Sequence, residues 1–134
     1  MPLPWARTGT DFGFSLTDGG ACPSAPWLPQ PPEWGKYSVE SQRADEHSFL
    51  NLYRAALRLR RDHPALGRGT LRWPDSGDPG SPGLLCLGRE PGFILAVNFG
   101  PAPVPLPAHR EILLASEPVT DGRLPPDTAA WLSA

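Results

Sequence analysis

The sequence predicts a mainly β protein in which a long Pro-rich loop and one helix precede an antiparallel β-domain. Three observations predict this fold class. Prolines crowd residues 1–44, one amphipathic pattern follows at residues 45–62, and the remainder alternates short apolar runs with turns that contain Gly and Pro. We therefore expect two regions, residues 1–66 and residues 67–134, with different secondary structure.

Composition limits the classes of protein to which the chain can belong. With 134 residues and 40% hydrophobic content, it can bury a modest core. The 19 Pro and 14 Gly are typical of disordered chains, but five Trp and five Phe favour a folded one. A net charge of -2 argues against nucleic-acid binding, and no apolar run reaches the roughly 18 residues that span a membrane. Since the start also lacks a signal-peptide pattern, we expect a soluble, cytoplasmic protein.

Residues 1–44 are predicted to form a long ordered loop. Pro interrupts both helices and strand ladders, so regular structure is not expected here. Loops longer than about 15 residues are usually functional or disordered. The loop also carries aromatic side chains that need a surface on which to pack, namely Trp5, Phe12, Phe14, Trp27, Trp34 and Tyr37.

A single amphipathic helix is predicted from Asp45 to Asp62. Asp45 is a suitable N-cap, and Pro64 favours an end near Asp62. Arginines on the opposite side and in the last turn are interpreted as a solvated helix face. Apolar residues recur at spacings of three and four and predict a core face, which consists of Phe49, Leu52, Tyr53, Ala56 and Leu59.

Six short segments after the helix have β-type composition and predict an antiparallel sheet or sandwich. These segments are Thr70–Trp73, Gly83–Arg89, Phe93–Phe99, Val104–Leu106, Glu111–Ser116 and Thr128–Leu132. Residues 93–97 contain no polar side chain, so we expect a central strand buried on both faces. Glu90-Pro91-Gly92 is the predicted hairpin turn before it.

The residue types that carry most chemistry show no catalytic or metal-binding arrangement. Cys22 and Cys86 are far apart and outside any CxxC motif, so we expect two separate thiols rather than a disulfide. His63 and His109 lack partners for nucleophilic or metal chemistry and are expected to face solvent or lie in turns. We expect no metal and no cofactor. Four loop carboxylates are expected to be solvated or turn-forming: Asp11, Asp18, Glu33 and Glu40.

Several short segments, spread over nearly the whole chain, combine into a more specific pattern. They are Pro2-Leu3-Pro4-Trp5, Gly13-Phe14-Ser15, Pro26-Trp27-Leu28-Pro29, Ser38-Val39-Glu40-Ser41-Gln42, Leu52-Tyr53-Arg54, Leu59-Arg60, His63-Pro64-Ala65-Leu66 and Val97-Asn98-Phe99. In this order they resemble the carboxy-terminal part of α-glucosidases of glycoside hydrolase family 13, particularly the actinobacterial type. Oligo-1,6-glucosidases and trehalose synthases share a similar series.

The resemblance implies a place for each region in a larger enzyme. The catalytic domain of this family is a (β/α)8 barrel, and residues 1–44 would belong to the long connection after its eighth strand, which borders the sugar-binding mouth. The helix from Asp45 to Asp62 would be the eighth barrel helix. Residues from about Gly67 onward would form the family's carboxy-terminal antiparallel β-sandwich.

The catalytic residues of that family are absent from this sequence. Its members use an Asp nucleophile, a Glu acid/base and a second Asp, all on earlier barrel strands. The Gly-Phe-Arg-x-Asp pattern of the nucleophile does not occur here, and neither Asn51 nor Asn98 begins an Asn-His-Asp. We therefore assign no catalytic residue, and expect the chain to be inactive alone.

The segment that would border the sugar-binding mouth departs from the family pattern in two places. The family has an Arg two residues before the position of Pro2, which would lie upstream of Met1, and its Gln-Trp-Asp is Pro4-Trp5-Ala6 here. Trp5 and Trp27 are candidate substrate-binding residues, because an aromatic ring can stack on the apolar side of a pyranose. Packing of the loop is the other interpretation of both side chains.

The expected function is that of a non-catalytic carboxy-terminal part of an α-glucosidase, bracing the barrel and shaping the substrate entrance. Its partner would be the missing catalytic barrel, and through it α-glucosides from which terminal glucose is hydrolysed with retention. One alternative is a protein-interaction module, since Pro26–Pro29 and Pro29–Pro32 fit PxxP. Another is a free-standing carbohydrate-binding β-domain that uses Trp73 and Trp131.

Overall fold

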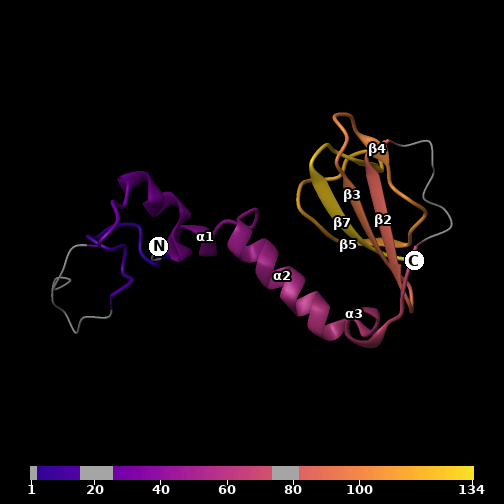
Figure 1. Cartoon of the computed structure of the whole chain (residues 1–134), viewed down its shortest axis with the longest axis horizontal. Coiled ribbons are helices and arrows are strands. Elements are labelled where there is room, and N and C mark those ends of the chain that lie inside the picture. The colour runs from indigo at the N-terminus through magenta and orange to yellow at the C-terminus, as the bar shows by residue number, and fades with distance from the viewer. Residues whose placement is uncertain (1–2, 16–25, 74–81) are drawn as a thin grey trace. The chain divides into compact units, whose positions relative to one another are not determined.

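The computed structural model describes residues 3–15, 26–73 and 82–134. The chain divides into two compact units, residues 1–54 and 55–134, and helix α2 crosses the boundary between them (Figure 1). The predicted division after residue 66 concerns the barrel and the β-domain of a larger enzyme, and it stays a prediction.

The first unit contains two short helices where the sequence predicts only a loop. These are the 3-10 helix η1 (Pro32–Tyr37) and the helix α1 (Val39–Arg43). Pro32 is the first residue of η1, where its missing N–H costs nothing and its fixed φ favours a helix. Ser38 caps α1, since its Oγ accepts a hydrogen bond of 3.2 Å from Ser41 N–H. Proline and serine chemistry thus creates helices inside the Pro-rich segment.

Gly35 lies buried at the centre of this unit. A Cβ at this position would overlap the backbone oxygen of Arg7, so only glycine fits between the two segments. The carbonyl of Gly35 accepts a hydrogen bond of 2.8 Å from Ser41 Oγ. The first segment of the chain is therefore packed directly on η1.

Helix α2 (Phe49–Asp62) begins four residues later than predicted and ends at Asp62 as predicted. Ser48 caps it, because Ser48 Oγ accepts a hydrogen bond of 3.3 Å from Asn51 N–H. Asp45, the predicted cap, instead accepts a hydrogen bond of 3.0 Å from His47 N–H in the turn before the helix.

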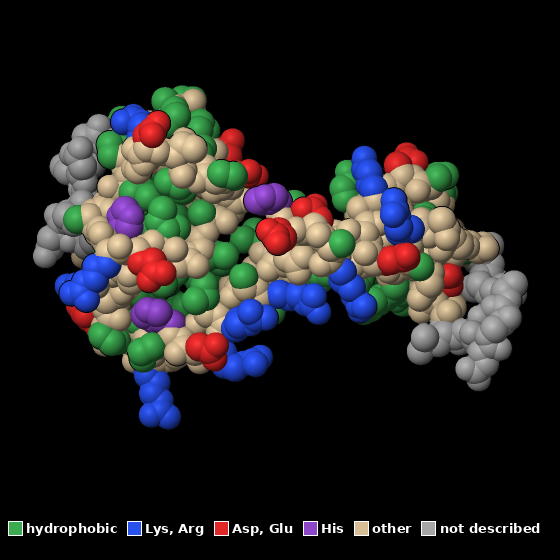
Figure 2. Space-filling model, turned by 180° about the vertical axis from the view of Figure 1, so that it is seen from behind, with side chains coloured by type: hydrophobic (Ala, Val, Ile, Leu, Met, Phe, Trp, Pro, Cys, Tyr) green, Lys and Arg blue, Asp and Glu red, His purple; other side chains and the backbone are tan. Residues whose placement is uncertain are grey.

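The apolar side of α2 is partly exposed in this chain, with Leu52, Ala56 and Leu59 half-buried. Phe49, Tyr53 and Leu57 follow one another at a spacing of four and are 76%, 66% and 56% exposed, and α2 has no buried residue. The prediction that Phe49 and Tyr53 face a core is therefore wrong for the chain by itself. The basic side chains of this helix are arginines, and they lie along it in Figure 2, in agreement with the predicted solvated basic face.

The second unit is an antiparallel β-sandwich (Figure 1). Its five-stranded sheet has the order β1 (Leu71–Arg72), β2 (Leu84–Arg89), β3 (Phe93–Asn98), β7 (Thr128–Ser133) and β5 (Glu111–Ala115). A second sheet consists of β4 (Val104–Pro105) and β6 (Arg123–Leu124). Each of the six predicted strands is present to within one residue at either end, and among the described strands only the two-residue β6 is missing from the prediction.

The core lies between the two sheets. Cys86, Ala96, Ala130 and Leu132 of the large sheet pack with Leu124 of β6, and all five are buried. The core thus covers one face of the five-stranded sheet.

The opposite face of the large sheet, here called the second face, is apolar but only half-buried along most of its width. Strand β3 is the central strand, as predicted, and Gly92, with φ +65°, supports the predicted turn before it. On the core side of β3, Ala96 and Asn98 are fully buried, as predicted. On the second face, Phe93 is 4% exposed, but Leu95 and Val97 are half-buried, so the prediction of burial on both faces is wrong for these two residues.

Asn98, at the end of β3, ties the two sheets together. Its Nδ2 lies 2.9 Å from the carbonyl oxygen of Ala102, 3.0 Å from that of Leu124 and 2.9 Å from that of Pro125. Its Oδ1 accepts a hydrogen bond of 2.9 Å from Gly100 N–H. The side chain is fully buried, which explains why an amide stands at this position in a strand that is otherwise apolar.

The two outer strands of the large sheet are short or irregular. Strand β1 has two residues, and β5 shows a register shift between Ile112 and Leu114. This shift is a β-bulge, which bends a strand locally and interrupts its ladder of hydrogen bonds.

Candidate functional site

Trp5 is held on a fixed backbone with half of its surface exposed. The N–H groups of Trp5 and Ala6 both donate to the carbonyl of Phe12, at 2.8 and 2.7 Å. Its own carbonyl accepts a hydrogen bond of 3.0 Å from Glu40 N–H at the start of α1. Its side chain is 51% exposed. A backbone held in this way need not be ordered when the ring stacks on a ligand.

The turn that faces Trp5 is organised by Asp11. Its Oδ1 accepts from Gly13 N–H at 3.1 Å and its Oδ2 from Ser15 N–H at 2.8 Å. The neighbouring Phe12 is buried and has φ +50°, a left-handed conformation that a non-glycine residue rarely adopts. The predicted turn-forming role of Asp11 is confirmed.

Trp27, the second candidate, is 98% exposed. It lies in a bend between Pro26 and Pro29. In the described parts of the chain, ring contacts join His63, Phe93 and Trp131, and neither Trp5 nor Trp27 takes part in one. The structure therefore places both candidates in the first unit with exposed rings, and it does not bring the two rings together.

The remaining loop carboxylates have structural positions. Glu40 accepts a hydrogen bond of 2.9 Å from Arg7 N–H and lies in the first turn of α1, where negative charge is favourable. Glu33 occupies the same position in η1. Asp18 lies outside the described residues. These positions fit helix starts and turns rather than acid/base catalysis.

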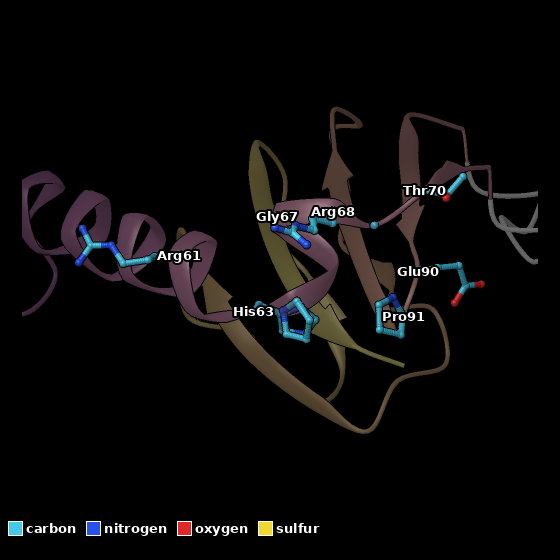
Figure 3. A pocket seen from close by; sticks show the side chains of 9 residues that line it. Arg61, His63, Gly67, Arg68, Thr70, Glu90 and Pro91 are labelled. Carbon is cyan, nitrogen blue, oxygen red and sulfur yellow. The ribbon is translucent and has the colours of Figure 1, made fainter.

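A shallow pocket of about 550 Å3 lies beside the short helix α3 (Pro64–Arg68). Its lining residues are Arg61, His63, Pro64, Gly67, Arg68, Gly69, Thr70, Glu90 and Pro91. In Figure 3, Arg61 and Glu90 lie at opposite sides of the view and point away from each other. Glu90 forms an ion pair of 2.8 Å with Arg72. Thr70 supplies the hydroxyl of this lining, and none of the described hydrogen bonds joins it to the side chain of His63 or Glu90.

His63 has a structural role that the sequence did not indicate. Its Nδ1 accepts a hydrogen bond of 3.3 Å from Ala65 N–H and so caps α3. Its ring packs edge-on against Phe93, with the ring centres 5.6 Å apart. The prediction of a solvent-facing or turn histidine is corrected: His63 is half-buried and joins α3 to the sheet. His109 is exposed, with Nδ1 2.8 Å from the carbonyl oxygen of Pro107.

Cys86 is a free thiol buried in the core, and burial raises its pKa above the ordinary value of 9.0. This favours the unreactive neutral form. Cys22 lies outside the described residues, so the expectation of two separate thiols stays a prediction. Within residues 3–15, 26–73 and 82–134, no His, Cys, Asp and Glu side chains cluster as metal ligands. No helix in these same ranges is both long and apolar enough to cross a membrane.

Comparison with known proteins assigns the β-sandwich to a domain class. Residues 85–131, from β2 to β7, match the family model described as "Domain of unknown function (DUF3459)". This is the carboxy-terminal domain of α-amylase-family enzymes. No curated protein sequence matches the chain.

Solved structures extend the likeness to nearly the whole chain. Isomaltulose synthase from Klebsiella sp. LX3 matches 98% of the chain with a TM-score of 0.74 and 24% identity. The trehalulose synthase MutB matches 99% with a TM-score of 0.71 and 22% identity. An α-glucosyl transfer enzyme matches 98% with a TM-score of 0.63 and 28% identity. The chain spans only 24%, 25% and 25% of these three structures, respectively.

The β-sandwich thus matches the carboxy-terminal domain of α-amylase-family enzymes over residues 85–131. The resemblance seen in the sequence is confirmed: the chain matches the carboxy-terminal part of enzymes of glycoside hydrolase family 13, the α-amylase family.

Proposed function

We propose that this chain is the non-catalytic carboxy-terminal part of a family 13 α-glucosidase, which braces a catalytic barrel and shapes its substrate entrance. One observation carries the proposal: 98% of the chain superposes on an enzyme of which it spans only 24%, while the sequence has none of the family's catalytic motifs. The parent enzyme would release terminal α-linked glucose by the two-carboxylate retaining mechanism, with both carboxylates on the barrel.

The bracing role is supported by helix α2. Its exposed row of Phe49, Tyr53 and Leu57 is apolar surface that a protein normally buries. As the eighth helix of a (β/α)8 barrel, α2 would turn this row toward neighbouring barrel elements. Residues 67–134 would then follow as the separate β-domain.

The entrance-shaping role belongs to the first unit. Barrel active sites are built by loops at the carboxyl ends of the strands, and the segment with Trp5 would be such a loop. The backbone of Trp5 is fixed by hydrogen bonds on both sides, and its ring is half exposed. We assign Trp5 and Trp27 to stacking against the sugar or against the rim of the entrance.

Two other functions receive less support. Pro32 starts a helix, so Pro29–Pro32 is not a continuous polyproline ligand, and bends at Trp27 and Leu28 interrupt the first PxxP segment. For a free-standing carbohydrate-binding domain, Trp131 is engaged with Phe93 at 5.6 Å between ring centres. Only Trp73, 69% exposed, would remain for a ligand.

The first test is the DNA upstream of the Met1 codon. We expect an open frame that encodes barrel strands with the missing Asp and Glu motifs. A stop codon and a promoter at this place would contradict the proposal. The purified 134-residue chain should hydrolyse neither maltose nor an aryl α-glucoside, and hydrolysis that survives controls for contaminants would contradict the predicted inactivity.

A second test concerns the two tryptophans in the full-length enzyme. Trp5→Ala and Trp27→Ala should raise the KM for an α-glucoside several-fold, since one stacking contact contributes on the order of 1 kcal/mol. Trp73→Ala is the matched control, because Trp73 is also exposed but belongs to the β-domain. Equal effects of all three changes would argue against a role of the first unit at the entrance.

A further inference from the structure

We propose that His63 makes the attachment of helix α3 to the sheet sensitive to pH: the neutral imidazole holds α3 in place, and protonation of the ring releases it. This inference goes beyond the proposed function and does not depend on it. It concerns the segment through which the chain passes from the end of α2, at Asp62, to the start of β1, at Leu71.

The imidazole of His63 can cap α3 only while it is neutral. Its Nδ1 lies 3.3 Å from the backbone nitrogen of Ala65 and accepts a hydrogen bond from that N–H. A neutral ring that accepts at Nδ1 carries its proton on Nε2, whereas a protonated ring has an N–H group at both positions. Protonation would therefore place two donors face to face, and the first turn of α3 would lose its cap.

The two ends of α3 are held by groups that respond differently to acid. With only five residues, α3 depends on its caps and contacts more than on its own hydrogen bonds. Its far end is fixed by Arg89 of β2, whose Nη2 donates a hydrogen bond of 2.7 Å to the carbonyl of Gly69. An arginine guanidinium does not lose its proton in proteins, so this contact is independent of pH. Of the two ends, only that of His63 can respond to acid.

The same ring joins α3 to the β-sandwich. His63 packs edge-on against Phe93, and Phe93 packs edge-on against Trp131, each with 5.6 Å between ring centres. The side chains at this contact are well covered, because Ala65 has no exposed surface and Phe93 is only 4% exposed. A change in the position of the His63 ring therefore alters both the cap of α3 and its contact with the sheet.

Within the described residues, no carboxylate forms an ion pair with His63 that would offset a charge on its ring. Glu90 lines the same pocket but is engaged with Arg72 at 2.8 Å. The charged neighbours of His63, in the chain or across the pocket, are Arg61, Asp62, Arg68 and Glu90 (Figure 3). A protonated ring would thus stand among arginines of α2 and α3, which repel it.

Acid should therefore release α3 without unfolding the β-sandwich. The released segment accepts the proton and the capped segment does not, so the stability of α3 falls as the pH falls. Since histidine side chains generally gain their charge between about pH 8 and 5, the release should occur in this range. Loss of one N-cap corresponds to about a five-fold change in the equilibrium between closed and open helix.

The test is hydrogen exchange of the 134-residue chain, resolved by residue with NMR between about pH 8 and 5. Protection factors remove the intrinsic effect of pH on exchange. We expect the protection of the Ala65 amide to fall about five-fold, in step with the chemical shift of the His63 ring, while the amides of β3 and β7 keep their protection.

Two variants serve as controls. In His63→Asn, the side chain can cap α3 and carries no charge at any pH, so the protection of Ala65 should be independent of pH. In His109→Asn, an exposed histidine of the same unit is replaced, and the pH profile of Ala65 should equal that of the parent chain.

Constant protection of Ala65 while the His63 ring titrates would overturn the proposal, and this comparison within the parent chain needs no variant. An equal fall of protection in His63→Asn would overturn it as well, and would assign the effect to a carboxylate such as Glu90. Loss of protection in β3 at the same pH would show unfolding of the β-sandwich instead of release of α3, and would also refute the proposal. None of these results bears on the proposed function, which the upstream DNA tests separately.

Discussion

Replacement of Asn98 by alanine should destabilise the β-sandwich more than any surface change. The variant leaves the carbonyls of Ala102, Leu124 and Pro125 and the N–H of Gly100 without their side-chain partner. The bonds with Leu124 and Gly100 are fully buried, and the other two are partly buried. At about 1–3 kcal/mol for each buried unsatisfied group and about 1 kcal/mol for each of the others, we expect a loss of about 4 kcal/mol or more.

Urea unfolding followed by circular dichroism measures this loss, with hydrogen exchange on β3 and β7 to locate it. Asn51→Ala is the matched control, because the Nδ2 of Asn51 also lies near three carbonyl oxygens, at 3.1, 3.3 and 2.8 Å, but these bonds are partly buried or exposed. We expect Asn51→Ala to cost about 1 kcal/mol. Equal losses in the two variants would refute the argument that burial, rather than the number of hydrogen bonds, sets the cost.

The variant Asn98→Asp tests the same site through pH. An ionised carboxylate would face three carbonyl oxygens in the folded state, so its folded pKa should rise above the ordinary value of about 3.9. A raised folded pKa means that the folded state holds the proton more tightly. The stability of the variant relative to the parent chain should therefore be highest below about pH 4 and fall toward pH 7. A stability difference independent of pH would contradict this environment.

Three further predictions follow from single positions. Gly69→Ala should lower the stability of the β-sandwich by more than about 2 kcal/mol, because its Cβ would overlap the carbonyls of Glu90 and Ala65. Gly67→Ala is the control: with free space around it, this change should be neutral or stabilise by up to about 1 kcal/mol. Similar urea midpoints for the two variants would contradict this. Ser48→Ala should lower the free energy of unfolding by about 1 kcal/mol and shorten α2, and Asp45→Ala should lower it less. The reverse order of the two variants in urea unfolding and helix amide exchange would show that Asp45 is the cap. Cys86 should resist alkylation at neutral pH until urea unfolds the chain. Because burial raises the pKa of Cys86, the folding stability that its thiol contributes should fall as pH rises above 9.0. Cys86→Ala should remove this fall.

Local chemistry accounts for what the sequence could predict. The strands of the β-sandwich lie between Gly and Pro turns, and Pro64 follows the end of α2 closely. These boundaries depend on backbone restrictions of neighbouring residues, which are visible in the sequence. The resemblance added the family, but not the geometry of Trp5 or Trp27.

Tertiary contacts account for what the sequence could not predict. Asp45 and Ser48 are both good caps, and the choice between them follows from a hydrogen bond of 2.8 Å that Ser48 Oγ donates to Gln42 outside the helix. Asn98 meets the carbonyl of Leu124 only because the two sheets pack together. The half-buried second face could not be predicted at all, because apolar alternation indicates that a face is suited to burial and not which domain covers it.

The irregular outer strands of the sheet decide how this chain can associate with others. A new strand adds to a sheet only where a long, flat edge offers free N–H and C=O groups. In the described part of the chain, β1 has only two residues and β5 carries a bulge, so neither outer strand is long and flat. Growth of the sheet into fibrils through backbone pairing is therefore disfavoured, even though apolar surface is exposed. Association through side chains that meet face to face is favoured instead, and it demands a partner of complementary shape.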